Sequence, residues 1–316
     1  MAAVCQLSLF DTVPVVIHRL EARRVRSQPA RVCVGRFLHL GAGVQSSALA
    51  EMIVEGELAP VDAVVFADTK DEPPWVYEQL DYLERRLATR GIPLERVARS
   101  AQGLVHDAIH GAGRFASMPL YTQDPRTGKT GILRRQCTSE YKIEPSDDWV
   151  RNWLVAHGHA RLIHDKRGWT RRQVSRQVCT EHLYGISLDE FYRSGKRGPG
   201  WQRAVYPLID RRMRRSDCER WLRERGLRVP YKSSCVHCPF HDDAYWRRLK
   251  TDYPAYFERA CRFDDWLRSP EGRRRFTRKL RQDVFLHRSG IPLREVDFEA
   301  PGAGPLFELC GDYCMT

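Results

Sequence analysis

The chain has 316 residues, of which 42% are hydrophobic and eight are Trp, so it can build a sizeable core and is not a disordered polypeptide. It has no apolar run near the roughly 18 to 20 residues that span a bilayer and no export-type N-terminus, so we expect a soluble, cytoplasmic protein without a membrane partner. The net charge of +12 is uneven, because residues 1–150 hold 18 basic and 19 acidic residues whereas residues 151–316 hold 34 and 21.

The first half of the chain alternates strand and helix patterns. After a lead-in without a clear period, an apolar strand over 37–40 is followed by a small-residue loop and a helix over 48–56. A second strand over 63–67, a helix over 75–90 and a third strand from 94 repeat this order. The alternation predicts an α/β fold, a parallel twisted sheet with helices on both faces, whose ligand site lies at the carboxyl ends of the strands.

The second half is less regular and more helical. A long functional loop over 111–142 precedes a helix over 145–157, and strand-like runs cover 183–187 and 205–209. Further helices are expected over 216–226, with Ser216 as N-cap, and over 244–249, 253–267 and 271–286. We divide the chain into a poorly ordered lead-in (1–35), an α/β domain (36–230) and a helical, Cys-bearing C-terminal region (231–316).

The loop after the first strand reads Gly-Ala-Gly-Val-Gln-Ser-Ser over 41–47. Small residues directly after a strand let backbone N–H groups approach an anion, and the following helix contributes its positive N-terminal end. The loop lacks the Gly-Lys-Ser/Thr of Walker A and the third Gly of the dinucleotide motif. We expect phosphate binding here, and a merely tight turn is the alternative. The candidate binding residues of the loop are Gly41, Ala42, Gly43, Gln45, Ser46 and Ser47.

Ten Cys in a chain without an export signal favour metal binding or catalysis over a disulfide framework. Cys235 and Cys238 have the spacing with which two thiolates converge on one metal or cluster. Cys137 lies between Arg135 and Lys142, cations suited to hold phosphate or sulfate and to lower a thiol pKa, unless they form only a solvated basic loop. Five other Cys are expected to be small buried hydrophobes: Cys5, Cys33, Cys179, Cys218 and Cys261.

The surplus positive charge lies in three Arg-rich segments, 171–176, 211–215 and 273–281, interleaved with Trp. Arg with aromatic side chains suits phosphate contacts and base stacking, so we expect a nucleic acid, DNA or tRNA, as a partner. Two simpler explanations stay open. The chain could be Arg-rich throughout without such a partner, and Trp at helical spacing belongs more often to a core.

The loop resembles the pyrophosphate loop (PP-loop) of the adenine-nucleotide alpha-hydrolase superfamily, whose usual form is Ser-Gly-Gly-x-Asp-Ser. Gly41, Ala42 and Gln45 depart from that form, and Gln45 is similar to the phosphoadenylyl-sulfate (PAPS) reductase branch. Residues 134–145 resemble the segment of sulfonucleotide reductases in which Arg, Cys and Lys-x-Glu-Pro follow one another. Three further stretches, 185–190, 206–209 and 287–293, are most similar to the phage and prophage branch of the PAPS reductase-like family.

The resemblance implies an adenine nucleotide at the loop, either ATP or a sulfonucleotide such as PAPS or its unphosphorylated relative APS, and Mg²⁺ could accompany it. Gly185 and Ser187 would lie beside this nucleotide. Asp68, at the end of the second strand, could meet the ribose or a metal, and an ordinary strand-end Asp is the alternative.

The resemblance also implies a [4Fe-4S] cluster. Iron–sulfur members of the family have two adjacent Cys where this chain has Cys137 and Thr138. The candidate metal ligands are Cys137, Cys235, Cys238 and, as a fourth, Cys310. Cys310 and Cys314 could instead be redox nucleophiles, or a cluster with three protein ligands could leave one iron open to a substrate sulfur. The candidate catalytic residues are Cys310, Cys314, Lys142 and Arg135.

Zinc is the alternative metal, because His237 and His241 lie close to the Cys-x-x-Cys pair and structural zinc accepts His and Cys together. A thioredoxin-like redox pair is a weaker alternative, because Pro239 follows the motif and the strand order differs.

We therefore expect a PP-loop enzyme that uses an adenine nucleotide and an iron–sulfur cluster for sulfur transfer to, or modification of, a nucleic acid. Two alternatives stay open. One is a sulfonucleotide reductase in which a C-terminal thiol attacks the sulfur and leaves an S-sulfonated Cys. The other is a zinc-stabilised nucleic-acid-binding module. A sulfur-donor or electron-donor protein would be a further partner of the enzyme.

Overall fold

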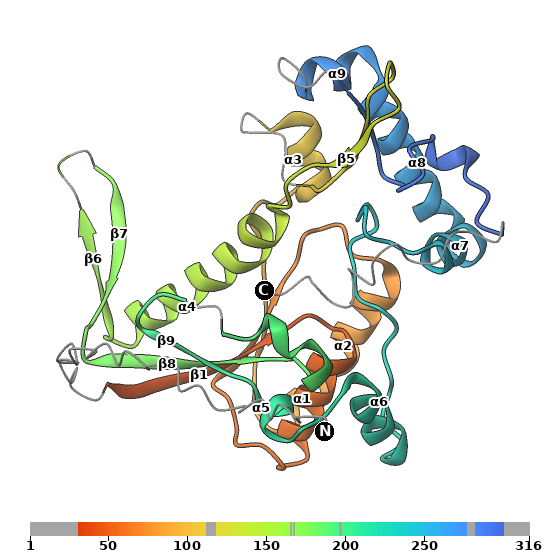
Figure 1. The fold of residues 1–316 in the computed structure, drawn as a ribbon. Coiled ribbons are helices and arrows are strands. Elements are labelled where there is room, and N and C mark those ends of the chain that lie inside the picture. Colours follow the sequence, from red (N-terminus) through yellow and green to blue (C-terminus); the bar gives the residue numbers. More distant parts are fainter. Residues whose placement is uncertain are drawn as a thin grey trace, which may run out of the picture. The chain divides into compact units, whose positions relative to one another are not determined.

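The computed structural model describes residues 31–111, 118–164, 166, 168–195, 198–276 and 282–299 (Figure 1). Of the expected lead-in over 1–35, residues 1–30 lie outside this description. No helix in the described part of the chain is long and apolar enough to cross a membrane.

A parallel sheet of five strands forms the centre of the α/β fold (Figure 1). In spatial order its strands are β3 (Leu94–Val97), β2 (Ala63–Ala67), β1 (Val32–Leu40), β8 (Val178–Tyr184) and β9 (Gln202–Val205). Every neighbouring pair in this sheet is parallel. The chain winds outward from β1 on one side and from β8 on the other, so the topological switch point lies between β1 and β8.

Helices cover both faces of the sheet, which confirms the predicted fold class. One face carries α1 (Val44–Val54), α2 (Pro74–Ala88) and α6 (Arg215–Glu224). The other face carries α4 (Glu144–Ala156), whose Trp149 and Trp153 rings stand edge-on to Phe37 of β1, with centroids 5.7 and 5.1 Å away. Leu38 belongs to the core on the α1 face, because successive side chains of a strand point to opposite faces.

The segment over 111–142, expected as a loop, contains two short strands, β4 (Tyr121–Gln123) and β5 (Thr130–Ile132). They form an antiparallel sheet with β10 (Asp283–Phe285), which pairs with β4. A π-helical turn over Ser139–Ile143 then leads into α4. Strands of three residues carry no readable period, and their partner lies far along the chain, so the sequence pattern could not reveal them.

The C-terminal region is helical as expected, except at its end. Its helices are α7 (Asp243–Asp252), α8 (Pro254–Arg268) and α9 (Pro270–Phe276). The prediction of one helix over 271–286 was wrong, because residues 283–285 form β10 and pair with β4. Shorter helical elements are α3 (Leu104–His110), α5 (Pro207–Asp210) and two 3₁₀ turns over Leu188–Arg193 and Leu293–Glu295.

The basic stretch before β8 forms a hairpin of β6 (Ala160–His164) and β7 (Thr170–Val174). The strand expected over 183–187 is β8, which starts earlier, at Val178, and ends at Tyr184. The sequence pattern did not reveal the earlier start, because Thr180, Glu181 and His182 are polar. The expected strand over 205–209 is wrong, since β9 ends at Val205 and α5 follows.

The N-terminus of α6 also differs from the prediction, which placed the N-cap at Ser216. Arg214 is the N-cap, and its backbone N–H donates to Asp217 Oδ2 at 2.8 Å. Ser216 lies inside the first turn of the helix. Because a carboxylate three residues on accepts this bond, the end of the helix is stabilised without a hydroxyl cap.

A buried pair of imidazoles joins β1 to β8 just before both strands end. His39 Nε2 lies 2.7 Å from His182 Nδ1, and His182 Nε2 lies 2.8 Å from Thr180 Oγ1. The two rings are stacked, with centroids 4.9 Å apart. Burial lowers the pKa of His39 to about 4, and burial together with His39 lowers the pKa of His182. Both rings are therefore neutral in the folded protein at neutral pH.

We expect the free energy of unfolding to fall as the pH is lowered from about 6.5 to 4, by on the order of 3 kcal/mol for His39 alone. The sign follows because the unfolded chain takes up these protons near the ordinary His pKa, whereas the folded chain does not. Urea unfolding followed across this pH range measures the effect.

His39→Phe keeps a ring in the stack but removes one titrating group, so the pH dependence should become shallower. Phe191→Leu, which changes an exposed aromatic side chain that does not titrate, is the control and should leave the pH dependence unchanged. A His39→Phe protein with the same pH dependence as the wild type would contradict the prediction.

Candidate functional site

The candidate site lies at the carboxyl ends of β2, β1 and β8, around the switch point where α/β sheets bind ligands. The small-residue loop follows β1, Asp68 follows β2, and Gly185 follows β8. α1 begins at Val44 rather than at 48, so Gln45 forms part of its first turn. The polar residues of the loop are therefore held by the helix itself.

The loop leaves backbone donors at the start of α1. Gly43 is the N-cap in an extended conformation without a side-chain cap, and Ser47 N donates to Gly43 O at 2.9 Å. Ser46 Oγ accepts from Gly41 N at 3.1 Å, which closes the loop on itself. Among the described residues, no acceptor reaches the backbone N–H groups of Val44, Gln45 and Ser46. Three such N–H groups at a helix N-terminus suit an anion such as phosphate.

Gly185 lets β8 approach this loop closely. A Cβ atom at position 185 would lie 2.7 Å from Ser46 N and 2.9 Å from Ser46 Cα, closer than real Cβ contacts allow. The absence of a side chain is therefore what permits the end of β8 to pack on the loop. This places Ser187 within 3.4 Å of the Gln45 amide nitrogen.

Gln45 is held by both neighbours of the loop. Its Nε2 lies within 3.4 Å of Ser187 Oγ and of Glu190 Oε2, while its Oε1 accepts from Arg215 Nη1 at 3.3 Å. Gln45 is only 2% exposed. An amide can accept from Arg and donate to Glu at once, which a carboxylate could not do. The contacts give a structural role to the departure from the usual motif.

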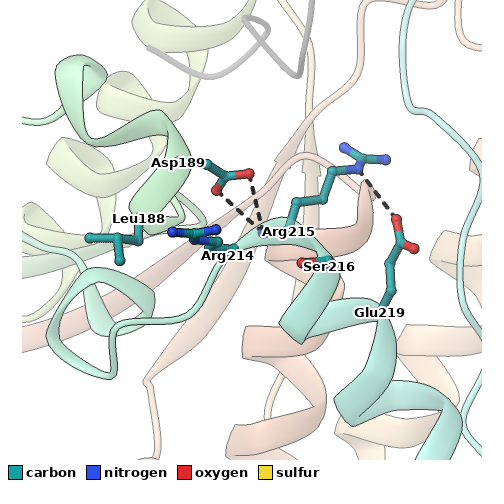
Figure 2. Close-up of a pocket in the computed structure, with 6 residues that line it drawn as sticks. All are labelled: Leu188, Asp189, Arg214, Arg215, Ser216 and Glu219. Atoms are coloured by element: carbon teal, nitrogen blue, oxygen red, sulfur yellow. Dashed lines mark hydrogen bonds and ion pairs between the residues drawn. The ribbon is translucent and has the colours of Figure 1, made fainter.

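A cavity of about 500 Å³ opens at the N-terminus of α6, next to Arg215 (Figure 2). Its lining residues are Leu188, Asp189, Arg214, Arg215, Ser216 and Glu219. Asp189 accepts from the backbone N–H of Arg215 at 3.3 and 3.4 Å, and Arg215 Nε lies 3.4 Å from Glu219 Oε1. Arg215 joins this cavity to the loop through Gln45. The volume is in the range of small-ligand pockets.

Asp68 lies at the carboxyl end of β2, as predicted, and is 3% exposed. Its Oδ1 accepts from the backbone N–H of Lys70 at 2.7 Å and from Tyr77 OH at 3.0 Å, and its Oδ2 meets Lys70 Nζ at 2.9 Å. Lys70 has a positive φ of 58°. Both carboxylate oxygens therefore hold the turn after β2. This favours the alternative that Asp68 is an ordinary Asp at the end of a strand.

Three of the candidate cysteines line one narrow cavity of about 20 Å³ together with both candidate cations. The lining includes Cys137, Cys235, Cys238, Arg135 and Lys142. These residues come from the segment before α4 and from the Cys-x-x-Cys loop before α7, about a hundred residues apart in the sequence. Their shared cavity puts thiols and cations in one place, which the resemblance implied.

A buried polar network surrounds Cys235. Thr69 Oγ1 lies 3.1 Å from Cys235 Sγ and 3.0 Å from Glu72 Oε1, and Lys142 Nζ lies 3.7 Å from the same Glu72 oxygen. Burial raises the pKa of Glu72, while Lys142 acts against that shift. Glu72 Oε2 has no hydrogen-bond partner among the described residues. Sequence reasoning missed Thr69 and Glu72, although their position just after a β-strand was an available signal.

Lys142 connects this cavity with the switch point. It is 6% exposed and also lines a second cavity of about 20 Å³. That cavity is formed with His39 and Tyr184 at the ends of β1 and β8 and with Ser146 of α4. The buried ammonium group of Lys142 therefore lies between the cysteine cavity and the edge of the sheet that carries the loop.

The two histidines considered for zinc have other partners. His237 Nδ1 lies 2.6 Å from Asp71 Oδ1, and its backbone N–H donates to Asp71 Oδ2. His241 Nε2 donates to Cys235 O at 2.8 Å, and its ring stacks on Tyr245. Burial lowers the pKa of His241, so its ring is neutral. Both histidines hold the Cys-x-x-Cys loop against its surroundings.

No group of three or more His, Cys, Asp or Glu in the described part of the chain forms a ready metal-binding arrangement. The three thiols that line the narrow cavity are of the donor type that soft metals and iron–sulfur clusters prefer. Because a cavity of about 20 Å³ holds about one water molecule, these thiols would have to move apart to hold a cluster. Cys310 and Cys314, predicted as fourth ligand or nucleophile, lie outside the described residues.

Solved structures that resemble the fold include a reductase and a tRNA thiolase. One is the PAPS reductase from Candida auris in its phosphate complex, with 13% identity, a TM-score of 0.38 and coverage of 62% of this chain and 75% of that chain. The other is the U34-tRNA thiolase NcsA from Methanococcus maripaludis with its [4Fe-4S] cluster, with 10% identity, a TM-score of 0.36 and coverage of 75% and 72%. Likenesses of this level do not assign a reaction. No family model and no curated protein matches the sequence.

Gly185→Ala should displace the loop, because its new Cβ would collide with the backbone of Ser46. We expect a loss of about 1 to 3 kcal/mol in the free energy of unfolding and a loss of at least about tenfold in affinity for ATP or PAPS. Urea unfolding and calorimetric titration measure the two effects.

Gly200→Ala is the matched control, since its Cβ would lie 3.4 Å from the nearest atom, a guanidinium nitrogen of Arg31. It should retain wild-type nucleotide affinity. Unchanged nucleotide binding in the Gly185→Ala protein would show that the loop is not the phosphate site.

Proposed function

We propose that this chain is a PP-loop enzyme that binds an adenine nucleotide at the loop after β1 and performs sulfur chemistry at Cys137, Cys235 and Cys238. The observation that carries the proposal is the position of two features at one edge of the sheet. One is the loop with its three N–H groups at the start of α1, and the other is the narrow cavity that three thiols share with Arg135 and Lys142.

The loop supports nucleotide binding through its backbone. N–H groups at the start of α1 and the positive end of the helix would hold the phosphates. Gln45, fixed by Arg215 and Ser187, replaces the usual Asp and adds no negative charge next to them. The cavity beside α6 has room for a further part of the nucleotide.

The cysteine cavity supports a thiolate-held cofactor. Cys137, Cys235 and Cys238 would hold an iron–sulfur cluster, which supplies an iron with an open position for a sulfur ligand when only three Cys bind it. Arg135 and Lys142 place positive charge where thiolates and an anionic sulfur group would meet. Lys142 would also contact the nucleotide side, because it lines the cavity near the switch point.

We propose a nucleic acid, DNA or tRNA, as the acceptor of this chemistry, with a sulfur-donor or electron-donor protein as a further partner. The support is the charge balance of +13 in the second half of the chain, which would attract a polyanion.

Anaerobically purified protein should contain iron and absorb near 400 nm. Cys137→Ser, Cys235→Ser and Cys238→Ser should each lower the iron content by at least about half, because each removes one thiolate ligand. Iron analysis and absorbance measure this without any assay of activity.

Cys33→Ser is the control, since Cys33, which was wrongly expected to be buried, is exposed on β1. It should keep the iron content of the wild type. A colourless wild-type protein with stoichiometric zinc would contradict the cluster and favour the zinc-stabilised module.

Incubation with PAPS or APS and a dithiol reductant separates sulfur transfer from sulfonucleotide reduction. We expect no stoichiometric release of sulfite from the wild-type protein. Release of sulfite that Cys310→Ser or Cys314→Ser abolishes would instead establish the reductase, in which one of these thiols breaks the sulfur–oxygen bond of the nucleotide and is itself S-sulfonated.

A further inference from the structure

We infer that the β6–β7 hairpin is a DNA-binding arm that enters the major groove of double-stranded DNA. The inference rests on the proposed function, which makes a nucleic acid the acceptor. What it adds is the surface that binds the nucleic acid and the type of nucleic acid that is bound. The hairpin lies between α4 and β8 in the chain, and in Figure 1 it extends from the amino end of β8.

The hairpin is strongly positively charged for a short segment. Residues 160–176 contain five Arg and one Lys against a single Asp. Arg172 is neutralised by Asp148 of α4 at 3.0 Å. In the part of the chain that the structure describes, no ion pair reaches Arg171 or Arg176, and both side chains are exposed. Uncompensated, exposed Arg on a narrow element suits phosphate contacts.

The strand register separates an anchoring face from a free face. Ala160 pairs with Val174 at the base of the hairpin, and both pack against the buried cluster that contains Val150 and Leu154 of α4. Arg161 and Arg171 belong to the opposite face, because side chains alternate along a strand. The guanidinium of Arg161 is held in place by Gln173 Oε1 at 3.1 and 3.2 Å. The hairpin thus presents cations on the face turned away from α4.

The end of the hairpin exposes a large aromatic side chain. Trp169 is 74% exposed, and Leu162 on β6 is 52% exposed. In the major groove of a duplex, an exposed aromatic side chain can make apolar contact with thymine methyl groups, next to the phosphate contacts of Lys166 and the Arg side chains. The same cations repel a second copy of the hairpin, which disfavours pairing of its open strand edges with another molecule of this chain.

The dimensions favour double-stranded DNA over double-stranded RNA. Each strand of the hairpin has five residues and so is about 17 Å long, and the two strands lie about 5 Å apart. A two-stranded ribbon of this kind fits the major groove of B-form DNA, which is about 12 Å wide. The major groove of A-form RNA is too narrow and deep to admit it.

The arm and the candidate site are at different ends of β8. The hairpin joins the amino end of β8 at Val178, whereas Gly185 and Ser187 follow its carboxyl end. The arm therefore contacts DNA about 23 Å from the nucleotide loop, the length of the seven-residue strand β8, and a long duplex can reach both places. Changes in the arm should alter DNA affinity and leave nucleotide binding and iron content intact, which distinguishes the arm from the reaction site.

The full-length protein is titrated into a fluorescent 30-base-pair duplex, and anisotropy is measured between about 50 and 200 mM salt. Arg171→Ala/Arg176→Ala should weaken binding by about tenfold or more and reduce the slope of log K against log salt by about 2, because two phosphate contacts are lost. Trp169→Ala should weaken binding without changing that slope. Arg220→Ala/Arg223→Ala removes two exposed, ion-paired Arg of α6 and is the matched control with wild-type affinity.

The variants are accepted as folded when their urea midpoints, ATP affinity and iron content equal those of the wild type. Arm variants that bind duplex DNA as tightly as the wild type would overturn the arm while leaving the nucleic-acid acceptor standing. A wild-type protein that binds no nucleic acid would overturn both. Preferred, arm-dependent binding to duplex RNA or to phosphatidylserine vesicles would overturn the assignment to DNA.

Discussion

The parallel pairing of β1 with β8 is the constraint on which the candidate site depends. It runs from Val32 opposite Val178 to His39 opposite Tyr184 and brings the ends of both strands to one edge. Beyond that edge, Gly185 lies so close to the loop that no side chain fits between them. The same pairing buries two imidazoles where water cannot solvate a charge, so the geometry of the loop is linked to rings that must stay neutral.

The loop has a buried polar network on each side, and the two networks connect to different cavities. On the β8 side, Gln45 and Arg215 connect the loop to the cavity at α6. On the β2 side, Glu72, Cys235 and Lys142 form the polar surroundings of the thiols. Buried polar groups are costly unless they are paired, so these contacts restrict the side chains to a few arrangements. Through Gln45 and Arg215 the loop is connected to a cavity of about 500 Å³, and a narrow cavity lined by three thiols follows the end of β2 at Thr69.

The distribution of charge is more informative than its sum. Much of the Arg surplus is neutralised locally: Glu57 binds both Arg211 and Arg225 at 2.8 Å, and Arg268 binds Asp264 at 2.7 Å. The partly exposed pairs of Glu57 contribute little to stability, whereas Asp264 is fully buried, but all of these pairs reduce the field that a distant polyanion meets. The hairpin carries exposed Arg171 and Arg176 without an acidic partner in the described part of the chain, and it shares this property with Arg212 and Arg274.

The sequence by itself determined the α/β class, the position of β2 and β3, and the loop before α1, because apolar alternation and small residues act over a few neighbouring positions. It also singled out Cys137, Cys235 and Cys238 from their spacing and their similarity to a family. Only the tertiary structure decided that Gln45 meets Arg215 and that Glu72 lies beside Cys235. Those contacts join residues more than 160 positions apart and depend on strand order. The short strands β4 and β10 and the basic hairpin escaped prediction for the same reason, since pairing rather than local pattern creates them.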